Sequence, residues 1–549
     1  MSLRKLLSVA VSLTALAVSS LAFAQVAPAD AASAANIKAH VTFLASDLLK
    51  GRDTGTPEYD IAANYVAAQF AQLGLKPAGA NGTFFQPVPL VAARPRDEGR
   101  YVLKARDGTE VALTFGDDYM VARPFGPETR KVSAPMVFVG FGIVAPEKKR
   151  DDFKGLDVKG KIVVVLSGAP SAYQTEERAY YANGRTKREQ AAKRGAVGMI
   201  SLYLPADEKR RPFAESKLNW QQWAMNWRNP DGTPHDTAPD TPSLGLLSLR
   251  GAEKLFTGAR VSWAKIAETA EKPQGEAPRF ALATSLDVTL HTETRMSESA
   301  NVAAMLEGSD PTLKSEVVVL SAHLDHIGIT PPLNGDSINN GALDNAAGIA
   351  TTLEVARAFK ESGKAPRRSV IFLAVTGEEK GLLGSEYFAR NPTVPATSLA
   401  ANVNLDMPVL TYAFTDVVAF GADRSTLGPA VARAAAKTGV ALSPDPMPEE
   451  GLFTRSDHFR FVEAGIPSIF LMTGFQNGGE AGFRGFLASC YHKPCDDLAL
   501  PINYEAGARF AAINYDIARE IADGDARPVW KKGDFFGGKF ARPALIAKE

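Results

Sequence analysis

The sequence predicts an α/β protein with a largely parallel sheet, preceded by a separate β-rich unit. After about residue 290, short runs rich in β-branched residues alternate with segments whose apolar residues recur at helical spacing. From about 90 to 283 the apolar runs are short and β-rich, with one helical segment among them. Alternating strands and helices are typical of parallel sheets, in which ligands bind at the carboxyl ends of the strands.

The composition is that of an ordinary globular protein. The chain has 549 residues, of which 45% are hydrophobic and 22% charged, and this length is enough for two or three domains. Basic and acidic residues number 61 each, so no overall field attracts nucleic acid or an anionic membrane. We therefore expect no nucleic-acid partner.

Residues 1–24 have the pattern of a signal peptide. Arg4 and Lys5 precede a short apolar stretch, and Ala-Phe-Ala stands before Gln25. Because the apolar stretch is short and interrupted by serines, an uncleaved membrane anchor is the weaker alternative. No later run is long and apolar enough to span a bilayer. We expect a periplasmic or secreted protein with no membrane anchor in its mature form.

Two segments precede the α/β part. Residues 25–89 carry apolar residues at helical spacing on both sides of a polar loop, Lys50–Glu58, which predicts two helices. Residues 90–283 form the β-rich unit. Within it, Trp220, Trp223 and Trp227 recur at the spacing of one helix face. We interpret them as a buried packing face, with an aromatic wall beside a substrate cleft as the alternative.

The segment 284–549 places metal-binding residue types where its strands end. The residues concerned are His323, Asp325, Glu378, Glu379 and Asp406, with Asp344 before a helix and His492 after a glycine-rich loop. A lone His or Asp after a strand is more often a helix cap or a loop residue. Five or more at one sheet edge are harder to explain in that way. Clustered carboxylates would also repel one another without a cation, so we predict a metal centre.

The number of ligands predicts two metal ions, and histidine with carboxylate suits zinc. One carboxylate must bridge such a pair, and Asp344, in a turn of small residues, is our candidate. Asp325 is then expected to accept the second N–H of the His323 imidazole. Of the adjacent Glu378 and Glu379, one is expected to bind an ion and the other to take a proton from the attacking water. Spacing alone leaves open which glutamate does which.

The motifs HLD, GALDNAAG, TGEEKGLLGS, NLDM and YHKPCD, in this order, resemble those of the secreted co-catalytic zinc aminopeptidase family of peptidase clan MH. That family also holds glutamate carboxypeptidase-like enzymes and glutaminyl cyclases. The resemblance implies the zinc exopeptidase fold, a three-layer αβα sandwich with a mostly parallel mixed sheet, and two Zn2+ ions. It assigns one zinc to His323 and Asp406, the other to Glu379 and His492, the bridge to Asp344 and the general base to Glu378. It also implies a cis peptide bond after Asp344.

Residues 90–283 resemble an inserted protease-associated domain, through VFVGFGIVAPEKKRDDFKGLDVKGKIVVVLSG and KREQAAKRGAVGMISLY. The resemblance implies a role in substrate access rather than in chemistry. The segment FLASDLLKGRDTGTPEYDIAANYVA resembles the helical opening of many family members, and residues 25–89 with 284–549 would form the peptidase domain.

We predict a di-zinc metallo-aminopeptidase that acts on peptides. A carboxypeptidase or dipeptidase would use the same ligands and differ in its pocket, since a free amine requires a carboxylate and a free carboxylate requires an arginine. A glutaminyl cyclase is less expected, because the complete ligand set suits the activation of water. A non-catalytic binding protein on the same fold is opposed by the presence of Glu378 and all five ligands. Another two-metal hydrolase, such as a phosphatase, is permitted by the ligands alone.

The RSDHF motif supplies candidate substrate contacts. Arg455 and His458 lie in it, and His326 lies close to the predicted ligands. For each histidine a purely structural role is the alternative. We interpret Ser456 and Asp457 foremost as a helix cap, with substrate contact as the alternative.

Two features near the C-terminus complete the expectations. Cys490 and Cys495 are the only cysteines and are expected to form a disulfide outside the cytoplasm. The C-terminal tail from Pro528 is rich in glycine and basic residues, which predicts a surface arm.

Overall fold

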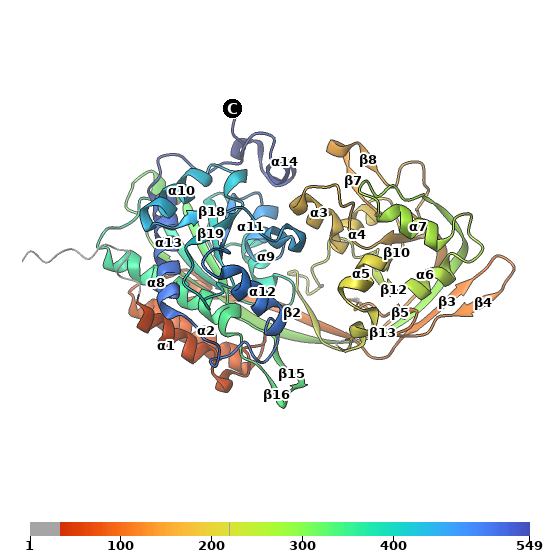
Figure 1. Cartoon of the computed structure of the whole chain (residues 1–549), viewed down its shortest axis with the longest axis horizontal. Helices are drawn as coiled ribbons and strands as arrows, with labels where there is room; N and C mark the ends of the chain where they lie inside the picture. The colour runs from red at the N-terminus through yellow and green to blue at the C-terminus, as the bar shows by residue number, and fades with distance from the viewer. Residues whose placement is uncertain (1–32, 124, 219, 549) are drawn as a thin grey trace, which may run out of the picture.

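The computed structural model describes residues 33–123, 125–218 and 220–548, so the predicted signal peptide lies outside the described residues. Figure 1 shows two units side by side, joined by the long strand β13, Phe280–Leu306. Residues 292–306 of β13 pair within the sheet of the larger unit, and residues 280–291 pair within the sheet of the smaller one. One strand is therefore shared by both sheets. In the part of the chain that is described, no helix has the length and apolar character needed to cross a membrane.

The larger unit contains a mixed, mostly parallel sheet. Four neighbouring strands run parallel in the order β17, β14, β18, β21, with β13 antiparallel at one side and β19 antiparallel at the other. Beyond β13 lie β2 and β11, and beyond β19 lies β20. The bounds are β1 Lys76–Pro77, β2 Phe85–Pro95, β11 Ala224–Trp227, β14 Val317–His323, β17 Ser369–Val375, β18 Leu399–Leu405, β19 Asp416–Phe420, β20 Ala441–Leu442 and β21 Ser468–Thr473.

Helices cover both faces of this sheet, which explains why every residue of its four parallel strands is buried. Successive strand residues point to opposite faces: Val318 and Leu320 join a core with α1, α2, α8 and α13, whereas Val317 and Val319 join a core with α9 and α11. The bounds are α1 Ala34–Leu44, α2 Pro57–Gln72, α8 Ala347–Glu361, α9 Leu383–Arg390, α10 Gly428–Thr438, α11 His458–Glu463, α12 Gly479–Ser489, α13 Tyr504–Asp523 and α14 Phe535–Phe540. The predicted three-layer α/β fold is confirmed.

The smaller unit has its own sheet and its own apolar core. Its strands follow the order β4, β3, β13, β6, β9, β10, β12, β5, with β6, β9, β10 and β12 parallel. The strand bounds are β3 Arg100–Lys104, β4 Glu110–Ala112, β5 Tyr119–Met120, β6 Thr129–Phe138, β7 Val144–Ala145, β8 Arg150–Asp151, β9 Ile162–Leu166, β10 Gly198–Leu202 and β12 Ser243–Leu247. The helices are α3 Thr175–Ala182, α4 Gly184–Ala192, α5 Pro205–Arg210, α6 Leu249–Leu255 and α7 Trp263–Ala270. The kinship of this unit to protease-associated domains stays a prediction.

The helix expected from the tryptophan spacing is wrong. Trp227 ends strand β11, is buried, and stacks on the ring of His235 with centroids 3.8 Å apart. Trp223 lies under the guanidinium groups of Arg94 and Arg295. The strand forms because β11 pairs with β2, and this tertiary pairing overrides a helical spacing carried by only three residues.

The C-terminal tail is not a surface arm. The side chain of Trp530 is fully buried, and its indole N–H donates to the carbonyl of Gly465 at 2.9 Å. Phe536 of α14 is also fully buried and contacts Phe453 and Phe459 of the larger unit. The tail therefore completes the core of the larger unit.

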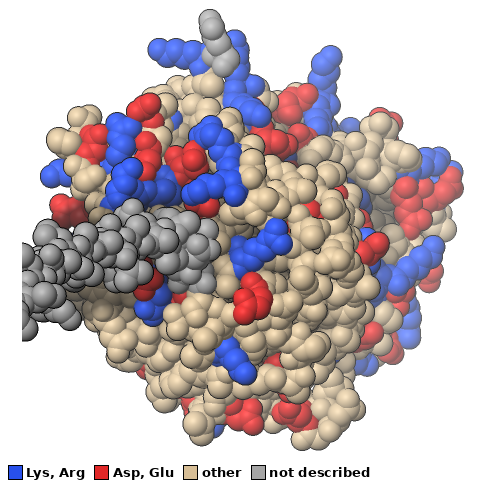
Figure 2. Space-filling view, turned by 60° about the vertical axis from the view of Figure 1, so that its left-hand side comes forward, with Lys and Arg blue, Asp and Glu red and all other residues tan. Residues whose placement is uncertain are grey.

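Charges of both signs are interspersed on the face of the molecule drawn in Figure 2. On this face, acidic and basic side chains stand next to one another rather than forming an area of one sign. This distribution agrees with the equal numbers of acidic and basic residues in the sequence.

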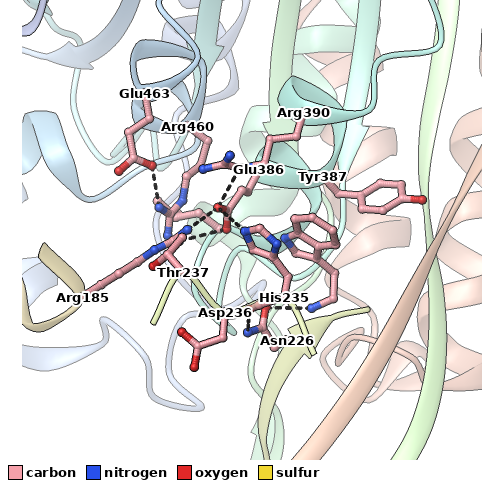
Figure 3. A network of polar contacts seen from close by, with 12 residues as sticks. Arg185, Asn226, His235, Asp236, Thr237, Glu386, Tyr387, Arg390, Arg460 and Glu463 are labelled. Carbon is pink, nitrogen blue, oxygen red and sulfur yellow. Dashed lines mark hydrogen bonds and ion pairs between the residues drawn. The ribbon is translucent and has the colours of Figure 1, made fainter. Parts of the chain in front are cut away.

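A buried carboxylate joins the two units. Figure 3 shows Glu386 of α9 facing Arg185 of α4, which donates to its two oxygens at 2.8 and 3.2 Å. Arg390 donates to the same carboxylate at 3.1 Å, and the ring of His235 lies 3.8 Å away. Although burial raises the pKa of Glu386, the guanidinium groups of Arg460 and Arg185 lower it to about 2. Glu386 is therefore ionised and holds the smaller unit against α9.

We expect Arg185→Ala to lower the free energy of unfolding by about 1–3 kcal/mol, because it removes a bidentate bond to a buried charge. Glu386 has a folded-state pKa depressed from 4.5, so its contribution is complete above pH 4.5 and is lost as the pH falls toward about 2. Denaturant unfolding of both proteins at several pH values measures this difference. Arg210→Ala is the matched control, because the Arg210 side chain is 80% exposed and its loss should cost less than about 0.5 kcal/mol. A full difference that persists at pH 2 would contradict the assignment to Glu386.

Candidate metal centre

The predicted ligands converge at the carboxyl edge of the parallel strands. His323 ends β14, while Glu378 and Glu379 follow β17 and Asp406 follows β18, and these three strands are neighbours. Asp344 lies in the turn of residues 342–346 that leads into α8. The sheet topology therefore gathers residues that are far apart in the sequence.

Asp344 stands between two groups of ligand-type atoms. Its Oδ1 lies 3.2 Å from Nε2 of His323, which in turn lies 3.0 Å from Oδ1 of Asp406. Its Oδ2 lies 3.4 Å from Nε2 of His492, which lies 3.3 Å from Oε2 of Glu379. Each oxygen of one carboxylate thus faces a separate pair made of one imidazole and one carboxylate.

A second histidine approaches the same glutamate. Nδ1 of His326 lies 2.7 Å from Oε1 of Glu379 and 4.0 Å from Oδ2 of Asp344, and the ring is fully buried. The other ring nitrogen of His326, Nε2, has no hydrogen-bond partner among the described residues. The sequence indicates His326 as a substrate contact or a structural histidine and not as a neighbour of the second ligand group. The structure places it beside His492, so that two imidazoles face Glu379.

The pKa values show a concentration of negative charge. Burial lowers the pKa of His323, but the carboxylates of Asp406 and Glu378 raise it well above its ordinary value. Burial raises the pKa of Asp344, but hydrogen bonds with His323 and His492 lower it well below its ordinary value. The pKa of Glu378 is raised by burial and by Glu379 and Asp406. Cations would offset this repulsion, and the imidazole and carboxylate donors fit zinc. Within the described chain, such clusters of ligand-type atoms occur only here.

The role expected of the Asp325 carboxylate needs correction. Nδ1 of His323 lies 3.0 Å from the main-chain carbonyl of Asp325, so this oxygen and not the carboxylate orients the imidazole. The carboxylate instead accepts the main-chain N–H groups of Glu378 and Glu379, at 3.1 and 3.3 Å, and the hydroxyl of Thr54 at 3.0 Å. Asp325 therefore fixes the backbone of the glutamate pair. The spacing of residues could not predict this contact, because any residue at position 325 supplies a main-chain carbonyl oxygen.

The turn that carries Asp344 is held by another aspartate. The carboxylate of Asp496 accepts the N–H groups of Leu343 at 2.9 Å and Asp344 at 3.0 Å. The peptide bond between Asp344 and Asn345 is cis, which confirms the expectation from the resemblance. Asp496 was not predicted as a site residue, although it directly follows Cys495 in the YHKPCD motif. Cys490 and Cys495 are joined by a disulfide, and the loop they close carries His492.

Glu378 lines a cavity of about 240 Å³ that opens beside the ligand groups. The predicted ligands His323, Asp344, Asp406 and His492 form one part of its wall. The other lining residues are Met407, Glu450, Leu452, Arg455, Ser456, Phe470, Leu487 and Tyr491. Most of these are apolar or aromatic, so the cavity suits an apolar side chain. The volume lies below the range of about 300–1,000 Å³ typical of pockets for larger ligands.

Of the two substrate contacts predicted in the RSDHF motif, Arg455 lines the cavity and His458 does not. Arg455 lines the cavity and pairs with Glu450 at 3.0 Å. His458 does not contact the cavity: it is fully buried beside Phe453 and Phe470, and burial lowers its pKa to about 3. A neutral imidazole among aromatic rings is structural, so the substrate-binding interpretation of His458 is wrong.

The cap interpretation of the same motif is also wrong. Asp457 directly precedes α11, but its side chain makes no capping hydrogen bond. Ser456 accepts from Asn404 at 2.7 Å and donates its own hydroxyl to the carboxylate of Asp406. Ser456 therefore orients a predicted ligand, which its position in the sequence did not indicate.

Comparison with known proteins finds relatives of the segment that carries the candidate site. Residues 301–518 match the profile of peptidase family M28, and this range contains every predicted ligand. These residues are similar to the M28 peptidases. The matched range includes the four parallel strands and the turn of Asp344.

Two curated proteins similar to this chain are named as an enzyme that inactivates leupeptin and as a probable aminopeptidase. Leupeptin-inactivating enzyme 1 of Streptomyces exfoliatus is 31% identical over 36% of this chain and 43% of that protein. A probable leucine aminopeptidase 2 of Aspergillus oryzae is 28% identical over 40% of this chain and 44% of that protein. The chain thus spans less than half the length of these two relatives. The aminopeptidase structure from Aneurinibacillus sp. strain AM-1 covers 89% of this chain and 94% of its own, with a TM-score of 0.51 and 19% identity, which shows a shared fold.

Proposed function

We propose that the protein is a di-zinc aminopeptidase that removes single residues from the N-termini of peptides. The observation that carries the proposal is the position of Asp344, whose two oxygens each face one imidazole and one carboxylate. Its support includes the similarity of residues 301–518 to peptidase family M28 and the aminopeptidase name of a relative. The proposed ligands are His323 and Asp406 for one ion, Glu379 and His492 for the other, and Asp344 for both.

Zinc ions held there would act as Lewis acids and lower the pKa of a water molecule to about 7. Glu378 is the proposed general base, because its carboxylate lines the same cavity and no ion needs it as a ligand. It would take a proton from the attacking water and deliver it to the leaving amine. Asp325 holds the main chain of Glu378 in place during both transfers.

The cavity wall supports an apolar terminal residue. Phe470, Leu487, Tyr491 and Met407 supply apolar surface beside Glu378. A terminal leucine or phenylalanine buried there would gain about 25 cal/mol per Å² of apolar area removed from water. We therefore propose that terminal leucine and phenylalanine are preferred over charged residues.

One observation favours a carboxypeptidase instead. Arg455 lies in the cavity wall, and a guanidinium binds a terminal carboxylate well. Glu450 also lies in the wall and offers the opposite charge to a terminal ammonium. Arg455 and Glu450 pair with each other. The wall therefore offers a positive group to a terminal carboxylate and a negative group to a terminal ammonium.

A peptide panel tests the proposal. The zinc-loaded protein is offered the same leucine-initiated peptide in free, N-acetylated and C-amidated forms. We expect cleavage of the free and C-amidated peptides and none of the N-acetylated one. Cleavage that survives acetylation but is lost on amidation would establish the carboxypeptidase.

We also propose that the protein acts outside the cytoplasm. The basic and apolar residues of segment 1–24 support export. The bond between Cys490 and Cys495 agrees with an oxidising compartment. Detection of a processed N-terminus at Gln25 in the extracytoplasmic fraction would test this.

A further inference from the structure

The polar loop between α1 and α2 contacts three of the segments that carry the proposed zinc site. The sequence predicts a connection between two helices there and assigns no role to its residues. In the structure, the consecutive residues Arg52, Asp53 and Thr54 each reach a different partner near the ligands. The loop lies outside residues 301–518, so the match to the peptidase family does not include it.

Arg52 is buried, with 1% of its surface exposed, and its guanidinium binds the main chain of the metal loops. Nε donates to the carbonyl of Leu324, next to His323, at 2.9 Å. Nη1 donates to Asn340 at 2.6 Å and Nη2 to Gly341 at 3.1 Å, just before the turn of Asp344. A further bond from Nη1 reaches the carbonyl of Leu44 at the end of α1. The planar guanidinium of Arg52 thus links the end of α1 to the chain beside His323 and to the chain before Asp344.

The Asp344 turn is held from both sides by opposite charges. Arg52 binds the carbonyls that precede it, and the carboxylate of Asp496 binds the N–H groups within it. Burial lowers the pKa of Arg52 to about 10, and the carboxylates of Asp325 and Asp496 oppose that effect. The guanidinium is therefore charged at neutral pH, and its charge favours the acidic groups around it.

The backbone of the loop also indicates a constrained position. Arg52 has φ 51°, a left-handed conformation that is uncommon for residues other than glycine. A Cβ atom on Gly51 would lie 2.2 Å from the carbonyl oxygen of Asn339, so the loop is pressed against the chain that leads to Asp344. Such conformations persist where the surrounding contacts over-determine them, and they cluster at functional sites.

The next two residues reach the glutamate segment. Asp53 pairs at 2.8 Å with Lys380, the residue that follows Glu379 in the sequence. Thr54 donates its hydroxyl to the carboxylate of Asp325 at 3.0 Å, and that carboxylate holds the main chain of the glutamate pair. Contacts from one loop therefore fix both the Asp344 side and the glutamate side of the site.

We propose that Arg52 is a positioning residue for the zinc centre, which it organises by holding the main chain beside His323 and before Asp344, with Thr54 supporting the glutamate segment through Asp325. This inference rests on one part of the proposed function, which is that zinc binds to the proposed ligands. Residues that orient metal ligands in this way typically contribute about 10- to 100-fold to metal affinity.

The test is the zinc dissociation constant of the full chain, measured by competition with a chromogenic chelator. Arg52→Lys keeps the charge, but a single ammonium cannot reach the acceptors now bound by Nε, Nη1 and Nη2. We expect the dissociation constant to rise by about 10- to 100-fold. Arg368→Lys is the matched control. Arg368 is also fully buried and donates to the main-chain carbonyls of Ile521 and Gly524, but it precedes β17 at the opposite edge of the sheet. We expect Arg368→Lys to lower thermal stability and leave zinc affinity unchanged.

A second variant keeps the test decisive if Arg52→Lys does not fold. Thr54→Val removes the hydroxyl that Asp325 accepts while preserving the shape of the side chain, and it should also weaken zinc binding. Wild-type affinity in the folded variants, or an equal loss in Arg368→Lys, would overturn the inference. A wild-type protein that binds no zinc would overturn the proposed function as well, so the two failures are distinguishable.

Discussion

Glu378→Gln is expected to reduce kcat for peptide hydrolysis by about 10²- to 10⁴-fold while the protein retains its zinc. The amide has nearly the same shape as the carboxylate but cannot accept a proton from the attacking water. Glu378 lines the cavity and is not one of the proposed ligands, so its loss should not weaken metal binding. Steady-state kinetics and zinc analysis of the purified variant measure the two effects separately.

Glu379→Gln is the matched control, because it is the same change at the adjacent position. Oε2 of Glu379 lies 3.3 Å from His492, and Oε1 lies 2.7 Å from His326, so this carboxylate is aimed at the second ligand group. We expect this variant to lose zinc along with activity. If Glu378→Gln lost its zinc, or kept full activity, the division of roles between the two glutamates would be wrong.

Asp344→Asn is expected to weaken the binding of both zinc ions. An amide offers one oxygen and no negative charge, whereas the carboxylate of Asp344 faces both ligand groups. Zinc content per chain after gel filtration in metal-free buffer should therefore fall below one equivalent. The wild-type protein should retain two under the same conditions.

Asp406→Asn provides the comparison for that result. Asp406 contacts His323 but belongs to only one of the two groups. This variant should retain the ion held by Glu379 and His492, so one equivalent should remain. Equal losses in the two variants would show that Asp344 does not bridge the two groups.

The central sheet and the convergence of the candidate ligands at its edge were predictable because the sequence carries strong local signals. Strands β14 and β17 are short, mostly apolar runs; His323 ends the first, and Glu378 follows the second after Thr376 and Gly377. Parallel topology then places those polar residues at one edge. Recognising the strands and placing the residues that follow them both require no knowledge of how side chains pack.

The supporting residues were not predictable, because their roles depend on contacts between distant segments. Arg52 and Leu324 are 272 positions apart, and Ser456 and Asp406 are 50 apart. The carboxylate of Asp325 holds main-chain N–H groups, which no residue pattern reveals. The tryptophan spacing failed for a related reason, since the pairing of β11 with β2 decided the local structure.

The most direct test of a two-zinc aminopeptidase is the rate of hydrolysis of a leucine-initiated, C-amidated peptide as zinc is titrated into metal-free protein. The account predicts no hydrolysis without zinc and a rate that reaches its plateau at two equivalents per chain. Hydrolysis in the metal-free protein, or none at any zinc level, would contradict it.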